Sequence, residues 1–225
     1  MKVGLAYTST TPELIERVEY EVKKRLGDEV EIVSRQDPGI LAEIRENGYV
    51  SAVSAARLIK MYAELAQEEV DAILNICSSV GEVADSMQDA ARYMGVPIVR
   101  IDEEMCREAV RKGERIAVMA TLPTTLEPTK NTIYRVAREM GKRVKTVDVL
   151  VEGAFGLDQD SFREKMREYA QRAVGDADVI LFAQGSMAYC EEYISRLCGK
   201  KVFSSPGFGA EALKCALQAK GVTLC

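Results

Sequence analysis

The chain has 225 residues, 47% of them hydrophobic and 29% charged, which is ordinary globular composition with enough apolar residues for one large core or two smaller ones. Its net charge of −5 argues against a nucleic acid as partner, because proteins that bind nucleic acids usually present a basic face. The apolar start of the chain meets polar residues at once and no apolar run approaches membrane-spanning length, so we expect a soluble cytoplasmic protein with no signal peptide and no membrane partner.

Short runs of β-branched residues alternate along the chain with longer amphipathic segments. The predicted strands are Val3–Tyr7, Val30–Val33, Ala72–Ile76, Ile98–Ile101, Ile116–Ala120, Val144–Leu150, Val179–Ala183 and Lys201–Phe203. The predicted helices are Pro12–Leu26, Val50–Gln67, Gly81–Met94, Pro123–Met140, Ser161–Ala173, Ala188–Leu197 and Gly209–Ala219. This alternation is typical of βαβ units and predicts an α/β fold with mostly parallel sheet flanked by helices.

An internal repeat divides the chain into two similar halves. Three stretches recur in the same order: 71–80 (DAILNICSSV) on 178–187 (DVILFAQGSM), 3–8 on 116–121, and 97–99 on 201–203. Parallel strands resemble one another, so each match alone is weak, but the ordered set indicates two related lobes. We predict a first lobe of residues 1–100 plus 208–225, which carries Cys77, and a second lobe of residues 101–207, which carries Gln184.

Small polar residues follow nearly every predicted strand. Ligands of parallel α/β sheets bind at the carboxyl ends of the strands, and helix N-termini there offer N–H donors that favour carboxylate or phosphate. Serine and threonine also occur at such positions simply as N-caps. A set of them at every strand end predicts an anion site. The predicted binding residues are Thr8, Ser9, Ser78, Ser79, Thr121, Thr124, Thr125, Gly185 and Ser186, with Thr10, Thr11, Ser204 and Ser205 in the same loops.

The six cysteines are scattered, and the chain has no histidine. Zinc sites of the usual kind need clustered thiolates or imidazoles, so we expect no metal site. Without histidine, a Ser-His or Cys-His nucleophile is excluded. Any catalysis must therefore use thiol, carboxylate, amine, phenol or backbone groups.

Cys77 ends a predicted strand directly before a helix. A helix N-terminus stabilises a thiolate, and the hydroxyls of Ser78 and Ser79 can donate to it, so this thiol is the candidate reactive group. A free cysteine is more often a small buried hydrophobe, and we adopt that core interpretation for the cysteines of amphipathic segments. These are Cys106, Cys190, Cys198 and Cys215, whereas Cys225 is terminal.

Three motifs together resemble the aspartate/glutamate/hydantoin racemase superfamily. They are strand-Cys-Ser-Ser at 77–79, Ala-Thr-Leu-Pro-Thr-Thr at 120–125 and strand-Gln-Gly-Ser-Met at 184–187, in order over essentially the whole chain. The resemblance implies two pseudo-symmetric α/β lobes with the active site between them, no cofactor (metal, pyridoxal phosphate or nucleotide), and a homo-oligomer. In that family two cysteines, one per lobe, flank the α-carbon of the substrate, and by resemblance Cys77 is the first of these.

The second catalytic position departs from the family pattern. Gln184 stands where the family usually has its other cysteine, and the internal repeat places it there independently. A neutral amide is neither an acid nor a base near neutral pH, so two-thiol racemisation is in doubt. Gln184 can instead serve as an oxyanion donor. Relatives with one thiol include arylmalonate decarboxylases, whose thiol resembles the second position, whereas maleate cis–trans isomerases use the first-lobe thiol as a nucleophile.

The expected function is that of a cofactor-independent racemase or isomerase acting through Cys77 next to a carboxylate or carbonyl of a small molecule. The substrate class is amino acid, hydantoin or dicarboxylate, and no lysine or arginine in the strand-end loops selects a second acidic group. A one-thiol decarboxylase or cis–trans isomerase of the same superfamily is the alternative reaction. A non-catalytic protein that binds small carboxylates is the alternative from another class.

Three other patterns have simpler interpretations. The segment Gly207–Ala212 mimics a dinucleotide fingerprint, but no second strand with a ribose-binding acid follows, so we interpret it as a helix start. The acids 102–104 precede a helical pattern, where the helix dipole favours them. The strongest basic cluster, formed by Lys142, Arg143 and Lys145, is interpreted as a solvated turn.

Overall fold

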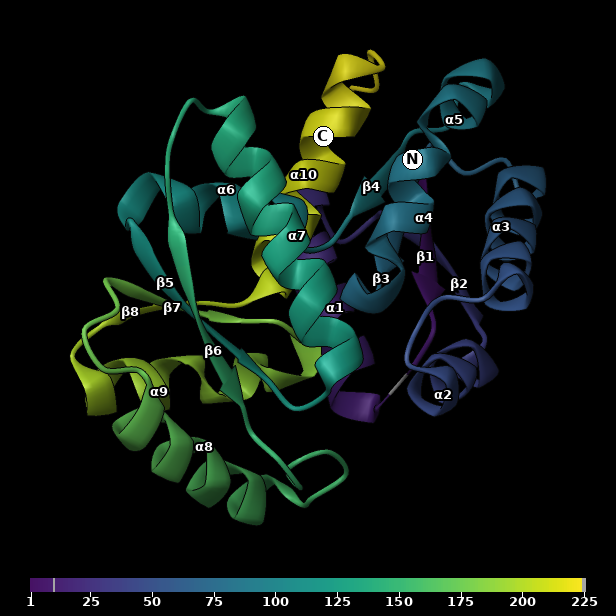
Figure 1. Cartoon of the computed structure of the whole chain (residues 1–225). Helices are drawn as coiled ribbons and strands as arrows, with labels where there is room; N and C mark the ends of the chain where they lie inside the picture. The colour runs from purple at the N-terminus through teal and green to yellow at the C-terminus, as the bar shows by residue number, and fades with distance from the viewer. Residues whose placement is uncertain (10, 224–225) are drawn as a thin grey trace. The chain divides into compact units, whose positions relative to one another are not determined.

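The computed structural model describes residues 1–9 and 11–223, including every side chain in these ranges except that of Ala173. Thr10 and Cys225 of the sequence analysis lie outside them. The chain forms two compact units, Met1–Ile101 with Pro206–Cys225 and Asp102–Ser205, and each contains a parallel four-stranded sheet flanked by helices (Figure 1). The predicted α/β fold class is confirmed.

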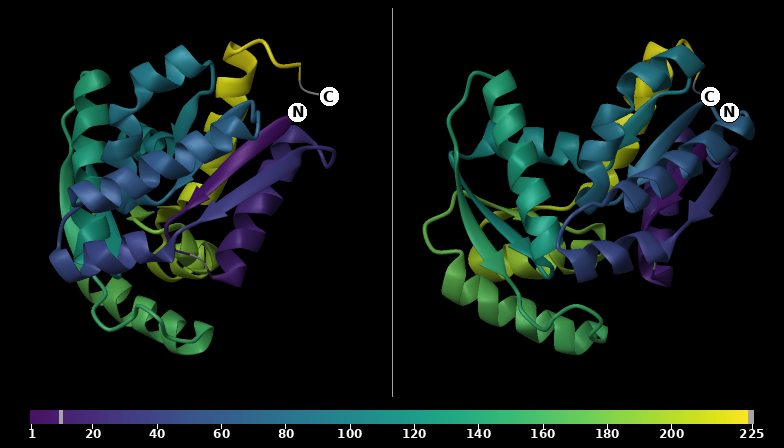
Figure 2. Two further views of the ribbon diagram at one scale, coloured as in Figure 1. Left: turned by 90° about the vertical axis from the view of Figure 1, so that its right-hand side faces the viewer. Right: turned by 45° about the vertical axis from the view of Figure 1, so that its right-hand side comes forward.

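The first unit is built on the sheet β2-β1-β3-β4. Its strands are β1 (Lys2–Tyr7), β2 (Glu31–Gln36), β3 (Ala72–Ile76) and β4 (Ile98–Arg100). Its helices are α1 (Pro12–Leu26), α2 (Pro38–Asn47), α3 (Ala52–Gln67), α4 (Gly81–Ser86), α5 (Gln88–Met94) and, from the carboxyl-terminal part of the chain, α10 (Ser205–Ala219). Helices α1 and α10 lie on one face of the sheet and α2 to α5 on the other (Figure 2). Their apolar side chains pack against the sheet.

The second unit repeats this plan with the sheet β6-β5-β7-β8. Its strands are β5 (Arg115–Ala120), β6 (Lys145–Leu150), β7 (Val179–Phe182) and β8 (Lys201–Phe203). Its helices are α6 (Glu103–Lys112), α7 (Pro123–Glu139), α8 (Gln159–Ala173) and α9 (Glu191–Cys198), with a 3₁₀ segment Gly185–Cys190 before α9. The central strands β5 and β7 are almost wholly buried, as expected for parallel strands covered on both faces.

The registers of the two sheets reproduce the internal repeat of the sequence. Val3 lies opposite Ala72 in the first sheet, and their aligned residues Ile116 and Val179 lie opposite each other in the second. The aspartates that open the repeated segments also do the same work. The Asp71 carboxylate accepts the backbone N–H of Lys2 at 2.9 Å, and the Asp178 carboxylate accepts that of Arg115 at 2.8 Å.

Most predicted elements are confirmed, with small shifts at their ends. All eight predicted strands are present, and Pro12–Leu26 is a helix with the predicted bounds, capped by the Thr11 hydroxyl with Pro12 in its first turn. The predicted helix 81–94 is two helices that meet at Met87. Helix α2 was not predicted, and the last helix begins at Ser205 rather than Gly209.

The buried cysteines confirm the core interpretation in part. Cys106 and Cys190 are fully buried, and Cys190 packs in the core of the second unit. Cys198 is half-buried, whereas Cys215 is exposed, so the core interpretation was wrong for Cys215. Its helix carries one apolar stripe, and position 215 lies away from the buried Leu213 and Leu217.

Gly209 shows why the segment 207–212 contains glycine. A Cβ atom at position 209 would lie 2.6 Å from Cγ1 and 2.8 Å from Cα of Ile101. The backbone of α10 therefore approaches the end of β4 more closely than any side chain permits. This packing explains Gly209 without a dinucleotide.

Replacing Gly209 with alanine is expected to destabilise the chain by about 1–3 kcal/mol or more, because the obstructing Cα belongs to a backbone that cannot turn aside. The matched control is Gly207→Ala in the same helix, where a Cβ meets the side-chain ends of Arg25 at 3.2 Å and of Glu21 at 3.6 Å and no backbone atom. Urea unfolding of the two variants measures the difference. Equal stability of both would contradict the close approach.

Candidate functional site

Cys77 lies at the carboxyl edge of the first sheet, beside Thr8. It follows β3 directly, Thr8 follows β1, and the last residues of these neighbouring strands, Tyr7 and Ile76, are opposite each other. Cys77 is half-buried. Thr8 is fully buried, and among the residues that the structure describes its hydroxyl has no hydrogen-bond partner, although it lies close enough to the Cys77 thiol to lower the pKa of that thiol. The pair therefore combines a partly accessible thiol with a hydroxyl donor that is free to act on it.

The surroundings of Cys77 act on its pKa in opposite directions. Burial raises the pKa of the thiol, while interactions with the Thr8 hydroxyl, the backbone N–H groups of Ser79 and Val80, and the Ser79 hydroxyl lower it. Burial outweighs the donors, so the pKa of Cys77 lies above its ordinary value. This differs from the expected thiolate stabilisation, because the helix start after Cys77 is only the 3₁₀ turn Ser78–Val80, whose few donors do not offset desolvation.

Alkylation of Cys77 by iodoacetamide is expected to rise with pH around a midpoint above about 8.5, the ordinary value for cysteine. Because the fold favours the neutral thiol, its contribution to stability is present below the ordinary pKa and is lost as pH rises through the raised one. Mass spectrometry of the Cys77 peptide gives the rate, with the urea-unfolded chain as reference.

The Thr8→Val variant is the control for this measurement, because it removes a donor and should move the alkylation midpoint further upward. A midpoint at or below that of the unfolded chain would contradict the dominant effect of burial.

A buried polar network supports the strand that carries Cys77. Asn75, near the end of β3, accepts a hydrogen bond from the Tyr62 hydroxyl at 2.9 Å and donates one to the Cys77 carbonyl at 3.0 Å. Tyr62 is fully buried, and Asn75 almost so. The oxygen and the nitrogen of the Asn75 side-chain amide are both hydrogen-bonded, and these bonds hold the backbone at Cys77 to the core of the unit. Sequence reasoning missed Asn75, although it is a polar residue inside an otherwise apolar run.

An ion pair between a buried arginine and a half-buried aspartate lies beneath the loop that follows Cys77. Arg100 donates to the Asp85 carboxylate at 2.7 Å, and its side chain is only 2% exposed. The guanidinium packs against Gly81, where an added Cβ would overlap it. The pair thus joins α4 to β4 directly behind the loop 77–81. No single-sequence pattern distinguished Arg100 from the other arginines.

The remaining predicted residues of the first unit cluster around Cys77. Ser78 and Ser79 are both buried in the 3₁₀ turn, and Ser9 is half-buried after Thr8. Thr11 is occupied as the cap of α1, where its hydroxyl accepts the N–H of Leu14 at 3.3 Å. The N-cap interpretation therefore holds for Thr11.

Gln184 and Thr121 form the corresponding pair in the second unit. They follow β7 and β5, as Cys77 and Thr8 follow β3 and β1. The amide oxygen of Gln184 accepts the backbone N–H of Thr121 at 2.7 Å, and its amide nitrogen donates to the Thr121 hydroxyl at 2.8 Å. The side chain is thus fixed against the end of β5. An amide nitrogen carries two protons, so one remains for a further acceptor.

The other predicted residues of the second unit lie at the start of two helical segments. Thr124 and Thr125 are in the first turn of α7, and the Thr124 hydroxyl is buried without a hydrogen-bond partner in the part of the chain that the structure describes. Gly185 begins the 3₁₀ segment, and Ser186 is exposed. The structure therefore brings the predicted residues together within each unit, at the carboxyl edge of its sheet.

The described residues contain no group of histidine, cysteine, aspartate or glutamate side chains that could hold a metal ion. None of the helices within 1–9 and 11–223 combines the length and the apolar character that crossing a membrane requires.

Comparison with known proteins gives one family. Residues 3–213 match the family model of the Asp/Glu/hydantoin racemases. Among solved structures, a glutamate racemase from Bacillus anthracis is similar with a TM-score of 0.72 and 17% identity, covering 98% of this chain and 82% of that one. An allantoin racemase from Klebsiella pneumoniae has a TM-score of 0.66 and 16% identity, covering 100% and 90%.

An arylmalonate decarboxylase also shares the fold, with a TM-score of 0.58, 13% identity and coverage of 96% of this chain and 92% of that one. No curated protein sequence gives a significant match to the chain. At these identities the structural likenesses establish the fold alone.

Proposed function

The chain belongs to the Asp/Glu/hydantoin racemase family, and from this we propose that it is an isomerase of small molecules that uses the Cys77 thiol to move a proton next to a carboxylate or carbonyl group and needs no cofactor. The observation that carries the proposal is the pair Cys77–Thr8: a half-buried thiol whose neighbouring hydroxyl is buried and has no other partner within residues 1–9 and 11–223. A hydroxyl in that position can donate a hydrogen bond to the sulfur of Cys77 when the thiol ionises.

The proton balance of the reaction follows from one thiol. As thiolate, Cys77 takes the proton from the carbon next to the carbonyl, becomes a thiol, and leaves the electron pair on the enolate. Thr8 and the N–H groups of Ser79 and Val80 stabilise the thiolate before transfer. Returning the proton to the opposite face requires an acid other than Gln184, whose amide has no ionisable proton near neutral pH. Water is the acid that we propose for that step, and the hydroxide that it leaves takes the proton from the Cys77 thiol, which restores the thiolate and the water.

For Gln184 we propose a binding role. Its contacts with Thr121 fix the amide, and its remaining N–H is suited to donate to a substrate oxygen on which charge develops. Because a fixed donor of this kind already points in the required direction, it stabilises the enolate without having to reorient as the negative charge develops. This role differs from that of the second cysteine in the family pattern.

A neutral or singly charged carbonyl compound is the proposed substrate class. The predicted binding residues near Cys77 and Gln184 supply hydroxyl, amide and backbone donors, and none is a lysine or arginine. The nearby cation Arg57 is paired with Asp37. Such a set suits a hydantoin-like ring, as in the substrate named for the allantoin racemases, better than the second carboxylate of glutamate.

Decarboxylation is the second candidate, and the raised pKa of Cys77 favours it. A thiol that stays protonated near neutral pH is a proton donor, and loss of CO₂ from a malonate leaves a carbanion that needs only one proton. A fold shared with an arylmalonate decarboxylase is consistent with this.

A proton NMR screen in D₂O distinguishes these reactions. The panel is allantoin, a 5-substituted hydantoin, glutamate, aspartate and phenylmalonate. Loss of the α-proton signal of a hydantoin or allantoin supports the isomerase, and appearance of phenylacetate supports the decarboxylase. If no compound changes but some raise the melting temperature, the chain binds carboxylates without catalysis, and the proposal is wrong.

A further inference from the structure

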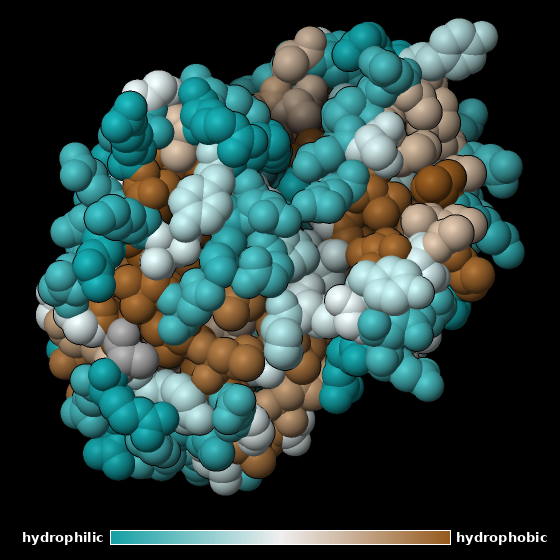
Figure 3. Space-filling view, viewed as in Figure 1, coloured by the Kyte–Doolittle hydropathy of each residue, from teal (hydrophilic) through white to brown (hydrophobic). Residues whose placement is uncertain are grey.

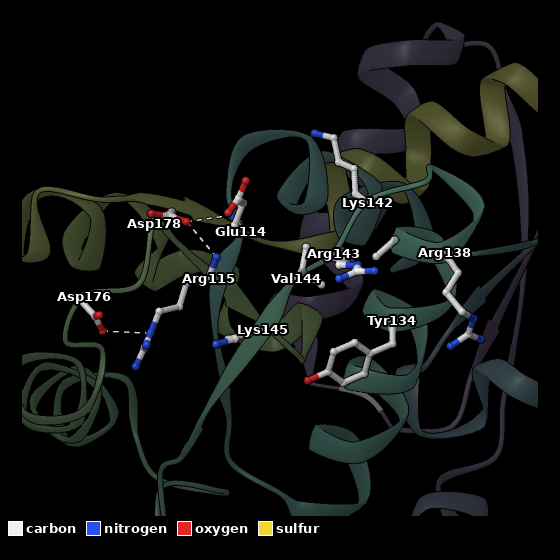
Figure 4. A pocket seen from close by; sticks show the side chains of 11 residues that line it. Glu114, Arg115, Tyr134, Arg138, Lys142, Arg143, Val144, Lys145, Asp176 and Asp178 are labelled. Atoms are coloured by element: carbon white, nitrogen blue, oxygen red, sulfur yellow. Dashed lines mark hydrogen bonds and ion pairs between the residues drawn. The ribbon is translucent and has the colours of Figure 1, made fainter.

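A basic groove lies at the amino edge of the second sheet, away from Gln184, which follows the carboxyl end of β7. It is formed by the turn before β5, the end of α7, the turn between α7 and β6, and the loop before β7 (Figure 4). Its volume is about 780 Å³, and a second hollow of about 510 Å³ continues from it, with Lys142, Arg143 and Val144 lining both. The basic cluster 142–145 is therefore one wall of a concavity, which the interpretation as a simple solvated turn did not foresee.

Two of the three acidic residues that line the groove, Asp176 and Asp178, are already engaged, and Glu114 is the third. The Asp178 carboxylate accepts the backbone N–H groups of Glu114 and Arg115, both at 2.8 Å, and these bonds lower its pKa. Asp176 pairs with Arg115 at 2.9 Å. These two carboxylates hold the start of β5, which leaves Glu114 as the single acid beside the four remaining basic residues of the lining.

Arg138, Arg143 and Lys145 are the basic residues left over. None of their side chains has an ion pair or a hydrogen bond with any residue in the described part of the chain, and all three residues are exposed. The second unit contains ten arginines. The other eight all form ion pairs within the described residues, namely Arg107, Arg111, Arg115, Arg135, Arg163, Arg167, Arg172 and Arg196. In a chain of net charge −5, two unpaired arginines in one groove are a local exception.

The groove also offers an aromatic face. Figure 4 shows the Arg143 guanidinium beside Val144, with the Tyr134 ring below it and Arg138 and Lys145 on either side. The Tyr134 side chain is 37% exposed, and its hydroxyl lies 2.8 Å from the hydroxyl of Thr146, which fixes the ring at the groove wall. Hydrophilic residues predominate on the visible surface around the turn between α7 and β6 (upper left in Figure 3).

We propose that this groove binds a small organic phosphate, whose phosphate groups are held by Arg138, Arg143 and Lys145 and whose organic part lies against Tyr134. Guanidinium groups match phosphate oxygens with paired N–H donors, and lysine adds a point charge. A single exposed pair contributes little, so a ligand with two or more negative charges is needed to use the three cations together. A volume near 780 Å³ exceeds that of a bare phosphate and is typical of small-molecule sites.

Isothermal titration calorimetry with ATP and with inorganic pyrophosphate tests the proposal in 150 mM NaCl. We expect both to bind, and the triple variant Arg138→Ala, Arg143→Ala, Lys145→Ala to weaken each at least tenfold. The matched control is Arg167→Ala, Arg172→Ala, Arg196→Ala, which removes three exposed cations of the same unit outside the groove and should change affinity less than twofold. Circular dichroism verifies that both variants are folded.

Tyr134→Ala separates the two parts of the site. It should weaken ATP and leave pyrophosphate unchanged, because only the organic ligand uses the ring. Absence of binding by both probes overturns the proposal, as does equal weakening in the control triple variant, which would show unspecific attraction. Citrate binding as tightly as pyrophosphate overturns the preference for phosphate. None of these outcomes depends on the chemistry of Cys77.

Discussion

Proton exchange at the substrate carbon is expected to fall by about 10²- to 10⁴-fold when Cys77 is replaced by serine, which is the usual contribution of a positioned acid or base. Serine keeps the size and the hydrogen bonding of the position, so Thr8 and the backbone donors remain in place. Its hydroxyl, however, is far too weak an acid to ionise near neutral pH. The measurement is the rate of α-proton loss in D₂O for the compound identified in the NMR panel.

Cys215→Ser is the matched control, because it makes the same substitution at an exposed thiol on α10. It should exchange the proton at the rate of the unaltered chain. Binding of the substrate by Cys77→Ser, measured as a thermal shift, should persist because the hydroxyl and amide donors are retained. Full activity of Cys77→Ser would show that the thiol takes no part in the reaction and that another group of the protein catalyses it.

Asp85→Ala is expected to destabilise the chain by about 1–3 kcal/mol, less than the loss of a fully buried ion pair, because Arg100 is buried but the Asp85 side chain is 35% exposed. Arg100 stays buried and loses its ion pair with Asp85 at 2.7 Å. For a chain of this length the melting temperature should fall by about 2–12 °C. Because Arg100 packs against Gly81, the loop that follows Cys77 should also loosen, and the exchange rate should drop beyond the loss of folded protein.

Asp89→Ala is the control for this comparison. It removes the same kind of side chain from the next helix, where the carboxylate pairs with Arg92 at 3.1 Å but both side chains are at least 80% exposed. Exposed pairs contribute between zero and about 1 kcal/mol, so its melting temperature should hardly change. If Asp85→Ala and Asp89→Ala have the same melting temperature, the burial of Arg100 does not make its ion pair more important for stability than the exposed pair.

The internal repeat was the strongest signal in the sequence, because the alignment of the two halves alone gives the equivalent positions in them. The alignment of 71–80 on 178–187 requires β3 and β7 to occupy equivalent places, and the registers with β1 and β5 agree with it. It also placed Cys77 and Gln184 at corresponding strand ends. Helix α2 was not predicted, because its ten residues are a short segment between two turns and show little apolar periodicity.

The sequence by itself determined the α/β class, the succession of strands and helices along the chain, and the position of the thiol at a strand end. These features depend on local periodicity and on short motifs. Only the tertiary structure decided the direction of the Cys77 pKa, the support of Cys77 by Asn75 and Tyr62, and the groove around Arg143. Desolvation, buried hydrogen bonds and unpaired charge depend on which distant segments the fold brings together, and no local pattern records that.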